Sequence, residues 1–375
     1  MKKILTVLLS VLMVFALVGC SQAADEPATE DAGTESNLVG VSMPTKSLQR
    51  WIQDGDNMKS QLEAAGYEVD LQYAGDNDIP TQVNQIENMI NNGCKVIVVA
   101  SIDGTALGTV MDQAKEAGIP VIAYDRLIMN TDGVTYYATF DNWLVGVTQG
   151  KFIEEKLDLA NAKANGKTYN IEYITGDPGD NNINFFFDGA MSVLEGYVAD
   201  GILNTPSGQV ATGNSKDGYD KAVVATANWA TDAAQARFEN ILSTYYSDGT
   251  QLDAILASND STALGCINAL NSNYTGETYP VITGQDADKP NVPHIVDGTQ
   301  GMAVFKDTRS LAGKVVEMVD AIMKGAEPPI NDTTTYDNGL KVVPSFLCEP
   351  VACTVDNYKE LLIDSGYYTL ADIGQ

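Results

Sequence analysis

The sequence predicts an α/β protein with two lobes, each built on a doubly wound parallel sheet. Apolar segments of strand length begin near residues 39, 68, 95 and 120, so successive starts are 29, 27 and 25 residues apart. Stretches with an apolar face of helical period lie between them. This spacing is typical of βαβ units, in which the strands are parallel and the crossovers right-handed. The same alternation resumes in the second half of the chain.

In the first half, strands are expected at 39–43, 68–73, 95–100 and 119–124. The second of these alternates polar and apolar residues, which indicates a place near the edge of the sheet. Helices are expected at about 48–65, 83–90 and 106–114, each followed by a glycine that can end it, Gly66, Gly93 or Gly118.

In the second half, strands are expected at 169–175, 223–227, 252–257 and 279–283, and helices at about 142–158, 184–200, 231–246 and 261–272. One more strand near 302–305 precedes a strongly periodic helix over about 311–322. The proline-punctuated segment 339–355 suits a chain that crosses back between lobes. We therefore expect a first lobe of 38–140 plus 306–335 and a second lobe of 141–305 plus 336–375.

The N-terminus has the features of an export signal. A basic start at Lys2 and Lys3 is followed by an apolar run over 4–18, too short for an ordinary transmembrane helix. Cys20 stands directly after this run, as in a bacterial lipoprotein signal, although a plain signal with a chance cysteine remains an alternative. Residues 1–20 are thus expected to be the signal and 21–37 an acidic, disordered tether. The body would then be exported and held to the outer face of the bacterial cell membrane by a lipid, or lie in the periplasm.

Composition excludes several function classes. The net charge is −28, which argues against nucleic acid as a partner and against electrostatic capture by an anionic membrane. The chain has a single histidine, His294, so a histidine-based triad or multi-histidine metal site is not expected, and no phosphate-binding glycine loop is present. No metal or other cofactor is expected. The sequence does not decide whether Cys348 and Cys353 form a disulfide, because a bridge would require a turn between them.

Polar residues gather just after the predicted strands. The run that begins at Ile119 ends abruptly in Asp125 and Arg126, and ligands of open α/β sheets sit beyond the carboxyl ends of the strands. Carboxylates, carboxamides, an arginine and flat aromatic rings suit an uncharged ligand with many hydroxyl groups, each of which donates and accepts. A simpler explanation for any single Asp or Asn after a strand is that it caps the next helix.

Longer motifs make the pattern more specific. The chain carries MPTK at 43–46, Arg50-Trp51, QIENMI at 85–90, YDRLI at 124–128, Phe140-Asp141-Asn142, Asp180-Asn181-Asn182, Ser258-Asn259-Asp260 and GQDAD at 284–288. Together they resemble the periplasmic sugar-binding proteins of the xylose-binding type, from about residue 38 to the C-terminus. The resemblance implies a type I binding protein, with two α/β lobes joined by a three-segment hinge. It implies ligand contacts at Arg50, Asp125, Arg126, Asn182, Trp229, Asn259, Asp286 and Lys306, and more weakly at Lys46, Trp51 and Asn181. The approach to Trp229 departs from the family pattern.

The implied mechanism is hinge closure on a monosaccharide, an aldopentose or an aldohexose such as xylose, arabinose, glucose or galactose. An ABC permease and its ATPase would be the partners of a monomeric binding protein. One alternative is a receptor that presents the bound sugar to a membrane signalling partner. Another is a glycosidase that uses Asp125 and Asp286, but a glycosidase needs one protonated carboxyl, and the neighbouring Arg126 favours the ionised form of Asp125. We therefore do not expect an enzyme.

Overall fold

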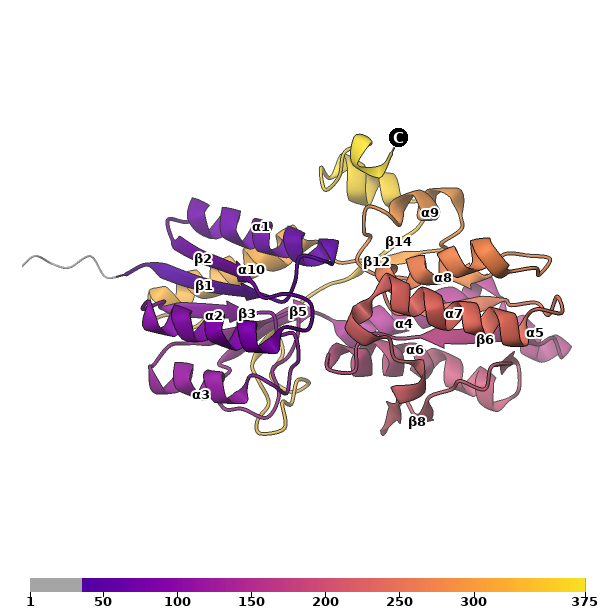
Figure 1. Cartoon of the computed structure of the whole chain (residues 1–375), viewed down its shortest axis with the longest axis horizontal. Helices are drawn as coiled ribbons and strands as arrows, with labels where there is room; N and C mark the ends of the chain where they lie inside the picture. Colours follow the sequence, from indigo (N-terminus) through magenta and orange to yellow (C-terminus); the bar gives the residue numbers. More distant parts are fainter. Residues whose placement is uncertain (1–35, 375) are drawn as a thin grey trace, which may run out of the picture. The chain divides into compact units, whose positions relative to one another are not determined.

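The computed structural model describes residues 36–374, which form one compact unit. Cys20, the signal and nearly all of the predicted tether lie outside the described residues. Within the described part the chain builds two parallel sheets, each with helices on both faces (Figure 1). This is the α/β class that the strand spacing predicts. In the range 36–374, no helix is both long enough and apolar enough to cross a membrane.

The first lobe contains a six-stranded sheet in the order β13-β5-β4-β3-β1-β2, with every neighbouring pair parallel. Its strands are β1 Leu38–Met43, β2 Glu68–Tyr73, β3 Val96–Val99, β4 Val121–Tyr124, β5 Tyr136–Phe140 and β13 Ser345–Cys348. The prediction that 68–73 lies near an edge is confirmed, because β2 ends the sheet. Gly66 and Gly118 have φ values of +95° and +69° just beyond helices, as the helix-stop interpretation requires.

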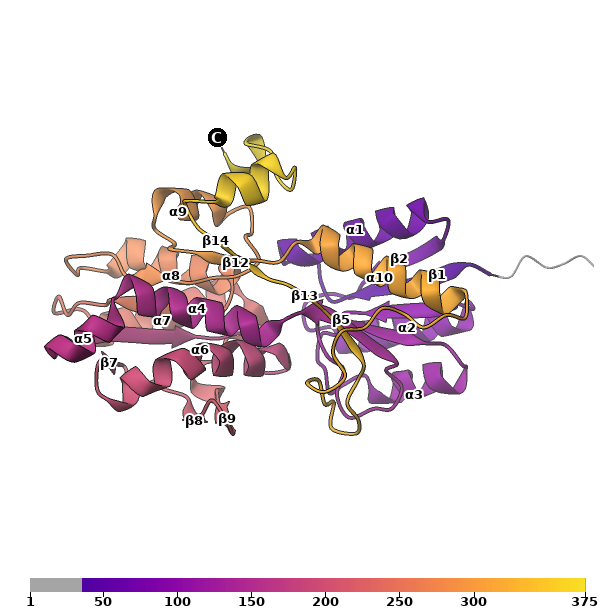
Figure 2. The same ribbon diagram turned by 180° about the vertical axis from the view of Figure 1, so that it is seen from behind.

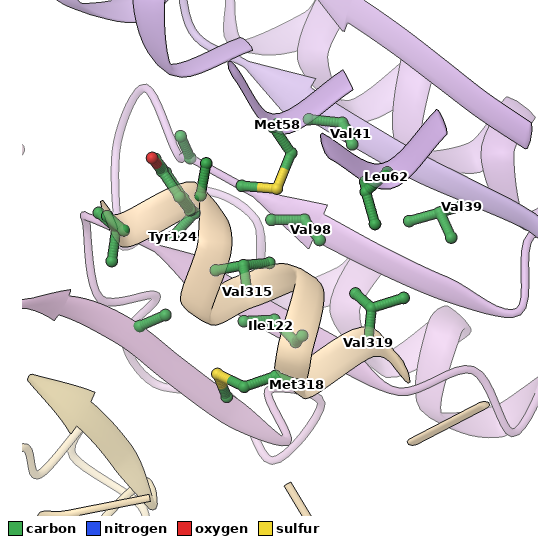
Figure 3. Packing of buried hydrophobic residues seen from close by; sticks show 14 of the residues in the cluster. Val39, Val41, Met58, Leu62, Val98, Ile122, Tyr124, Val315, Met318 and Val319 are labelled. Atoms are coloured by element: carbon green, nitrogen blue, oxygen red, sulfur yellow. The ribbon is translucent and has the colours of Figure 1, made fainter. Parts of the chain in front are cut away.

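Helices cover the two faces of this sheet in pairs. Helices α1 Gln49–Ala64 and α10 Thr308–Met323 lie on one face, and α2 Ile79–Asn91 and α3 Gly108–Glu116 lie on the other. Alternate residues along a strand serve opposite faces, so Val98 and Ile122 pack under α1 and α10 while Ile97 and Val121 pack under α2 and α3. Figure 3 shows the first of these cores, with Val315 and Met318 of α10 lying over the strands.

The second lobe has a four-stranded sheet in the order β11-β10-β6-β7, where the strands are β6 Tyr169–Ile174, β7 Leu203–Asn204, β10 Ala254–Ala257 and β11 Val281–Ile282. Helices α4 Asn142–Lys156, α5 Leu159–Asn165 and α6 Asn182–Ala199 pack on one face. Helices α7 Thr231–Tyr245 and α8 Asp260–Asn273 pack on the other. A hairpin of β8 Thr212–Asn214 and β9 Gly218–Asp220, the short helix α9 Val292–Asp297 and a ribbon of β12 Ala303–Phe305 with β14 Val351–Cys353 complete the lobe.

Helices α4 and α6 approach each other closely because α4 carries glycines where they meet. A Cβ atom at Gly146 would lie 2.0 Å from the carbonyl oxygen of Phe186, and one at Gly150 would lie 2.6 Å from that of Ala190. Neither distance is possible for a real side chain without movement of the backbone. The two glycines therefore fix the spacing of the helix pair, and the start of α6 carries Asn182 towards the other lobe.

The expected boundary of the second lobe is wrong for residues 336–348. Strand β13 pairs in parallel with β5, from Ser345 opposite Tyr137 to Cys348 opposite Phe140, and Tyr336 packs in the core of the first lobe. The chain then crosses and continues as β14 beside β12. The apolar run that ends at Cys348 supplies a sixth strand for the first sheet, and sequence pattern alone does not say which sheet a strand joins. The predicted crossing within 339–355 is present, between β13 and β14 (Figure 2).

The strand expected at 223–227 is also absent. The chain forms two short 3-10 turns there, η1 Ala222–Val224 and η2 Ala227–Trp229. This segment contacts the end of β6 through only two backbone hydrogen bonds, from the Thr175 N–H to the Val224 carbonyl and from the Thr226 N–H to the Gly176 carbonyl. A short apolar run is compatible with a turn when only some of its residues are buried, and Val223 is 54 % exposed. Cys348 and Cys353 are free thiols, so the disulfide that the sequence left undecided is not formed.

The C-terminal segment belongs to the second lobe but touches the first. Its π-helix η3 Lys359–Asp364 and its 3-10 turn η4 Ala371–Ile373 pack beside α9 (Figure 1). The hydroxyl of Tyr368 accepts hydrogen bonds from Nε2 of Gln49 at 3.0 Å and Nε2 of Gln53 at 3.1 Å, both on α1. The segment thus joins the two lobes outside the three chain crossings.

Candidate functional site

A cavity lies between the lobes, at the carboxyl ends of the strands of both sheets. Its walls come from the start of α1, from the loops after β4, β6, β10 and β11, and from the residue after β12. This is where open α/β sheets bind ligands. The residues that line it are Leu48, Arg50, Trp51, Asp125, Arg126, Asp180, Asn182, Phe186, Trp229, Asn259, Ser261, Gln285, Asp286, Asp288 and Lys306. All eight principal residues implied by the resemblance are among them.

Arg50 stands at the centre of the cavity wall and spans both lobes. Its Nε lies 2.9 Å from Asp54, its Nη2 lies 2.6 Å from Oδ1 of Asp125, and its Nη1 lies 2.9 Å from Oδ1 of Asp286. Asp54 and Asp125 belong to the first lobe and Asp286 to the second. Burial opposes the charge on Arg50, but the three carboxylates together raise its pKa well above the ordinary value. The guanidinium is therefore a permanent cation that ties the lobes together.

Lys306 brings a second cation to the same carboxylates. Its Nζ lies 3.0 Å from Oδ1 of Asp286 and 3.8 Å from Oδ1 of Asp125, and the side chain is 3 % exposed. The rings of Phe140 and Phe186 lie 6.0 and 5.6 Å from the ammonium nitrogen, close enough for weak cation–π attraction. Two carboxylates and two cations thus form a closed ring of opposite charges.

The carboxyl of Asp125 is held in its ionised form. Burial alone would raise its pKa, but Arg50, Lys306 and Arg126 outweigh burial and bring the pKa below the ordinary value. Asp54 lies behind the ring, where it accepts a hydrogen bond from Tyr124 and burial raises its pKa despite Arg50. The cavity therefore presents Asp125 as a fixed acceptor.

The backbone at Asp125 is strained and firmly supported. Its φ of +58° lies in the left-handed region, which is costly for a residue with a side chain. Its carbonyl oxygen accepts three hydrogen bonds, from Tyr137 Oη at 2.6 Å, Asn182 Nδ2 at 2.8 Å and Thr139 Oγ1 at 3.1 Å. These bonds fix the turn that points the carboxylate into the cavity. Trp229, Asp286 and Ala287 also have positive φ, so the strain gathers around this site.

Arg126 is fixed beneath an aromatic ring. Its Nη1 donates to the carbonyl oxygens of Ser101 and Ile102 at 3.0 and 3.1 Å, and its Nε lies 2.8 Å from Oδ2 of Asp180 in the other lobe. The guanidinium carbon lies 4.9 Å from the centre of the Trp51 ring. Trp51, a weaker candidate, thus lines the cavity and also positions Arg126.

Asn182, not Asn181, faces the cavity. Asn182 is 1 % exposed, donates to the backbone of Asp125, and accepts from Asn142 Nδ2 at 3.0 Å and Tyr137 at 3.2 Å. Asn181 is partly exposed, and its oxygen accepts from Asn184 instead. Because α6 begins at this point, adjacent residues point in different directions.

Trp229 lies in the cavity wall despite the unusual approach to it. The turn has φ values of +55° at Asn228 and +56° at Trp229, and the indole packs edge-on against Phe186 with ring centres 6.3 Å apart. A Cβ atom at Gly176 would lie 2.1 Å from the indole, so the ring depends on that glycine. Within residues 36–374 the indole Nε1 is buried without a hydrogen-bond partner.

Of two further candidates, Asn259 has a second structural role and Lys46 lies outside the cavity. Asn259 lines the cavity but also caps α8, because its Oδ1 accepts from the Thr262 backbone N–H at 3.0 Å. The capping explanation and the cavity position therefore hold together at this residue. Lys46 does not line the cavity; it is exposed, and its ammonium lies 4.7 Å from the centre of the Tyr73 ring.

The ligand contacts implied by the resemblance leave out several lining residues, notably Asp180, Ser261, Gln285 and Asp288. Asp180, Gln285 and Asp288 stand inside the motifs that carry the resemblance, so their positions after strands were a usable signal. Burial raises the pKa of Asp180 despite Arg126. No cluster of three or more His, Cys, Asp or Glu side chains suited to a metal occurs in the described part of the chain.

Comparison with known proteins agrees with this geometry. Residues 39–327 match the family model described as periplasmic binding protein domain. The chain belongs to the periplasmic binding proteins. It is 48 % identical to the multiple sugar-binding periplasmic receptor ChvE of Rhizobium radiobacter, over 94 % of this chain and 96 % of that one. It is 34 % identical to the D-xylose-binding periplasmic protein of Escherichia coli, over 89 % and 92 %.

This periplasmic binding protein is also similar to solved structures of solute-binding proteins. A solute-binding protein of an ABC transporter from Clostridium phytofermentans, with bound β-D-glucose, is 61 % identical, has a TM-score of 0.85, and is matched over 90 % of this chain and 99 % of its own. A carbohydrate transporter solute-binding protein from Chloroflexus aurantiacus, in complex with D-glucose, is 34 % identical with a TM-score of 0.79, and is matched over 89 % of this chain and 97 % of its own. The resemblance to sugar-binding proteins of the xylose-binding type and the type I fold are confirmed.

Proposed function

We propose that this chain is the solute-binding component of an ABC sugar importer, and that it closes its lobes on one monosaccharide. The observation that carries the proposal is the ring formed by Arg50, Asp125, Lys306 and Asp286, to which both lobes contribute. Its fixed donors and acceptors suit hydroxyl groups, and Trp229 offers a flat apolar face. The full set becomes available only when the lobes meet, so a sugar shifts the population towards the closed form.

Relatives support the choice of ligand. The 61 % identical solute-binding protein holds β-D-glucose, and the 48 % identical receptor is named for binding several sugars. An aldohexose or aldopentose is therefore the proposed ligand class. The residues proposed to contact it are Arg50, Asp125, Arg126, Asn182, Trp229, Asn259, Asp286 and Lys306.

We propose binding without chemistry on the sugar. A glycosidase would require Asp125 or Asp286 to act as an acid, and both carboxyls are paired with Arg50 and Lys306. The lowered pKa of Asp125 also opposes that role. Incubation of the protein with an aryl glycoside should release no phenol.

The deciding experiment is a thermal-shift panel on residues 38–375 with xylose, arabinose, glucose, galactose, ribose and a nucleoside. A ligand that binds only the folded state stabilises it by about 2.7 kcal/mol at a hundred times its dissociation constant. One or more free aldoses should raise the melting midpoint and be recovered unaltered. No shift with any monosaccharide would contradict the proposal, and a response to the nucleoside alone would assign another solute class.

Location and partners follow from the same proposal. The relatives are periplasmic proteins, and Cys20 after the apolar run supports a lipid anchor on the outer face of the cell membrane. Labelled palmitate should enter the full-length protein and not the Cys20→Ser variant. A permease and ATPase are the proposed partners, and deletion of the gene should abolish sugar uptake; normal uptake with loss of a sugar response would favour the receptor alternative.

A further inference from the structure

The loop after β11 brings three polar side chains, Gln285, Asp286 and Asp288, to one wall of the cavity. The Asp286 backbone N–H donates to the Val304 carbonyl at 2.9 Å, and Asp286 and Ala287 have φ values of +92° and +54°. These conformations turn the chain sharply at the buried Ala287, so Asp286 and Asp288 both line the cavity. The Asp288 backbone N–H donates to Oδ2 of Asp260 at 2.8 Å and anchors the far end of the loop.

Two of these side chains have unsatisfied atoms. Oδ1 of Asp288 and Oε1 of Gln285 are both buried and have no hydrogen-bond partner within residues 36–374. The two residues are only 7 % and 2 % exposed. A buried polar atom without a partner is costly, so native structures seldom keep one without a use. Both atoms belong to residues in the cavity wall, where a ligand group can bond to them.

The charges around Asp288 differ from those around Asp125 and Asp286. Those two carboxylates are paired with Arg50 and Lys306, whereas no cation lies within ion-pair distance of Asp288 in the described structure. Burial raises the pKa of Asp288 to about 7, assisted by Asp286 and Asp54 and opposed by Arg50 and Lys306. A carboxyl that keeps its proton both donates and accepts.

Asp260 lies behind Asp288 and is itself fully engaged. Its carboxylate accepts from Gln300 Nε2 at 2.7 Å and from the Asp288 backbone, and burial followed by Asp288 raises its pKa well above the ordinary value. A second negative charge beside it would be costly, so the neighbourhood favours a neutral ligand group over a carboxylate or phosphate.

We infer that Asp288 and Gln285 form a further sugar-binding corner, in which they bind one hydroxyl group of the ligand and so select among monosaccharides. A protonated carboxyl and a carboxamide together offer a donor and acceptors, which match a hydroxyl group. This inference rests on the proposed function. The alternative is that Asp288 only supports the loop and Asp260, in which case its loss would weaken every sugar equally.

The test compares variants with ligands that lack single hydroxyl groups. Isothermal titration would measure D-glucose, its 2-, 3-, 4- and 6-deoxy analogues and D-xylose against the wild type, Asp288→Asn, Asp288→Ala and Gln285→Ala. Asp356→Asn is the matched control, because Asp356 is an exposed acid of the same lobe with no side-chain hydrogen bond in the described structure. Melting curves would establish that each variant is folded.

For one hydroxyl position, the deoxy analogue should bind the wild type about tenfold more weakly than glucose. The same analogue and glucose should bind Asp288→Ala with nearly equal affinity, because the variant lacks the carboxyl that bonds to this hydroxyl group and so cannot distinguish the two ligands. Equal weakening of every ligand, or no weakening of any, would overturn the inference while leaving the proposed function intact. Failure of the wild type to bind any of the sugars would overturn both. If Asp288→Ala does not fold, Gln285→Ala gives the same comparison, whereas Asp288→Asn keeps a donor and an acceptor and should keep the discrimination.

Discussion

Replacing Arg50 by methionine should destabilise the closed protein by more than any other single change of a charged residue in the cavity. The change keeps much of the apolar stem but removes the guanidinium. Arg50 is the only cation paired with Asp54 among residues 36–374, and Asp125 and Asp286 would keep only Lys306. Removal of one partner from a buried ion pair leaves an uncompensated charge and typically costs about 3–5 kcal/mol.

The expected loss is measured by urea unfolding, followed by tryptophan fluorescence and far-UV circular dichroism. Arg309→Met is the matched control, since the side chains of Arg309 and Asp307 are 34 % and 23 % exposed. A partly exposed pair of this kind contributes about 0–1 kcal/mol. If Arg50→Met lost less than about 1 kcal/mol, or no more than Arg309→Met, the ring of charges would not stabilise the structure as argued.

Three other changes test the fold and the site. The pKa of Asp288 is raised from 3.8 to about 7, so the folded state binds this proton more tightly than the unfolded state does. The free energy of unfolding should therefore fall by about 1.4 kcal/mol for each unit by which the pH rises within that interval. Asp288→Asn should flatten this pH dependence in urea titrations. Gly176→Ala would place a Cβ atom 2.1 Å from the Trp229 indole, so sugar affinity measured by titration should fall at least tenfold with the circular dichroism spectrum retained. Gly146→Ala would press on the backbone of Phe186 and should lower stability by about 1–3 kcal/mol, and an unchanged melting midpoint would show that α4 and α6 can separate at little cost.

Hydrophobic period and helix-stop glycines sufficed for most of the first lobe. The expected helix ending before Gly66 and the edge strand at 68–73 both match the structure. Strand ends located the site because residues such as Asp125 and Lys306 follow strands directly. Trp229 follows a predicted strand that does not form, but the resemblance also implied it as a ligand contact, and it lines the cavity.

The remaining differences arise from choices that depend on tertiary structure. From its sequence strand β13 could join either sheet, and in the structure it pairs with β5 at the edge of the first sheet. Asp180 and Asp288 read as ordinary acids, because their importance comes from Arg126 on the other lobe and from burial among other carboxyls. Sequence spacing does not encode either circumstance.

The position of β13 has a consequence for the order in which the protein can be made. The first sheet lacks its sixth strand, and its core lacks the cover of α10, until residues 308–348 have left the ribosome and crossed the membrane. By then the four-stranded sheet of the second lobe and its helices α4 to α8, which lie between β5 and α10 in the chain, have already emerged. The apolar face over Val98 and Ile122 lacks its α10 cover during that interval, so the sheet that is made first is completed after the sheet of the second lobe. Deletions within 308–348 should therefore leave an exported chain whose second lobe folds and whose first lobe is exposed to proteases.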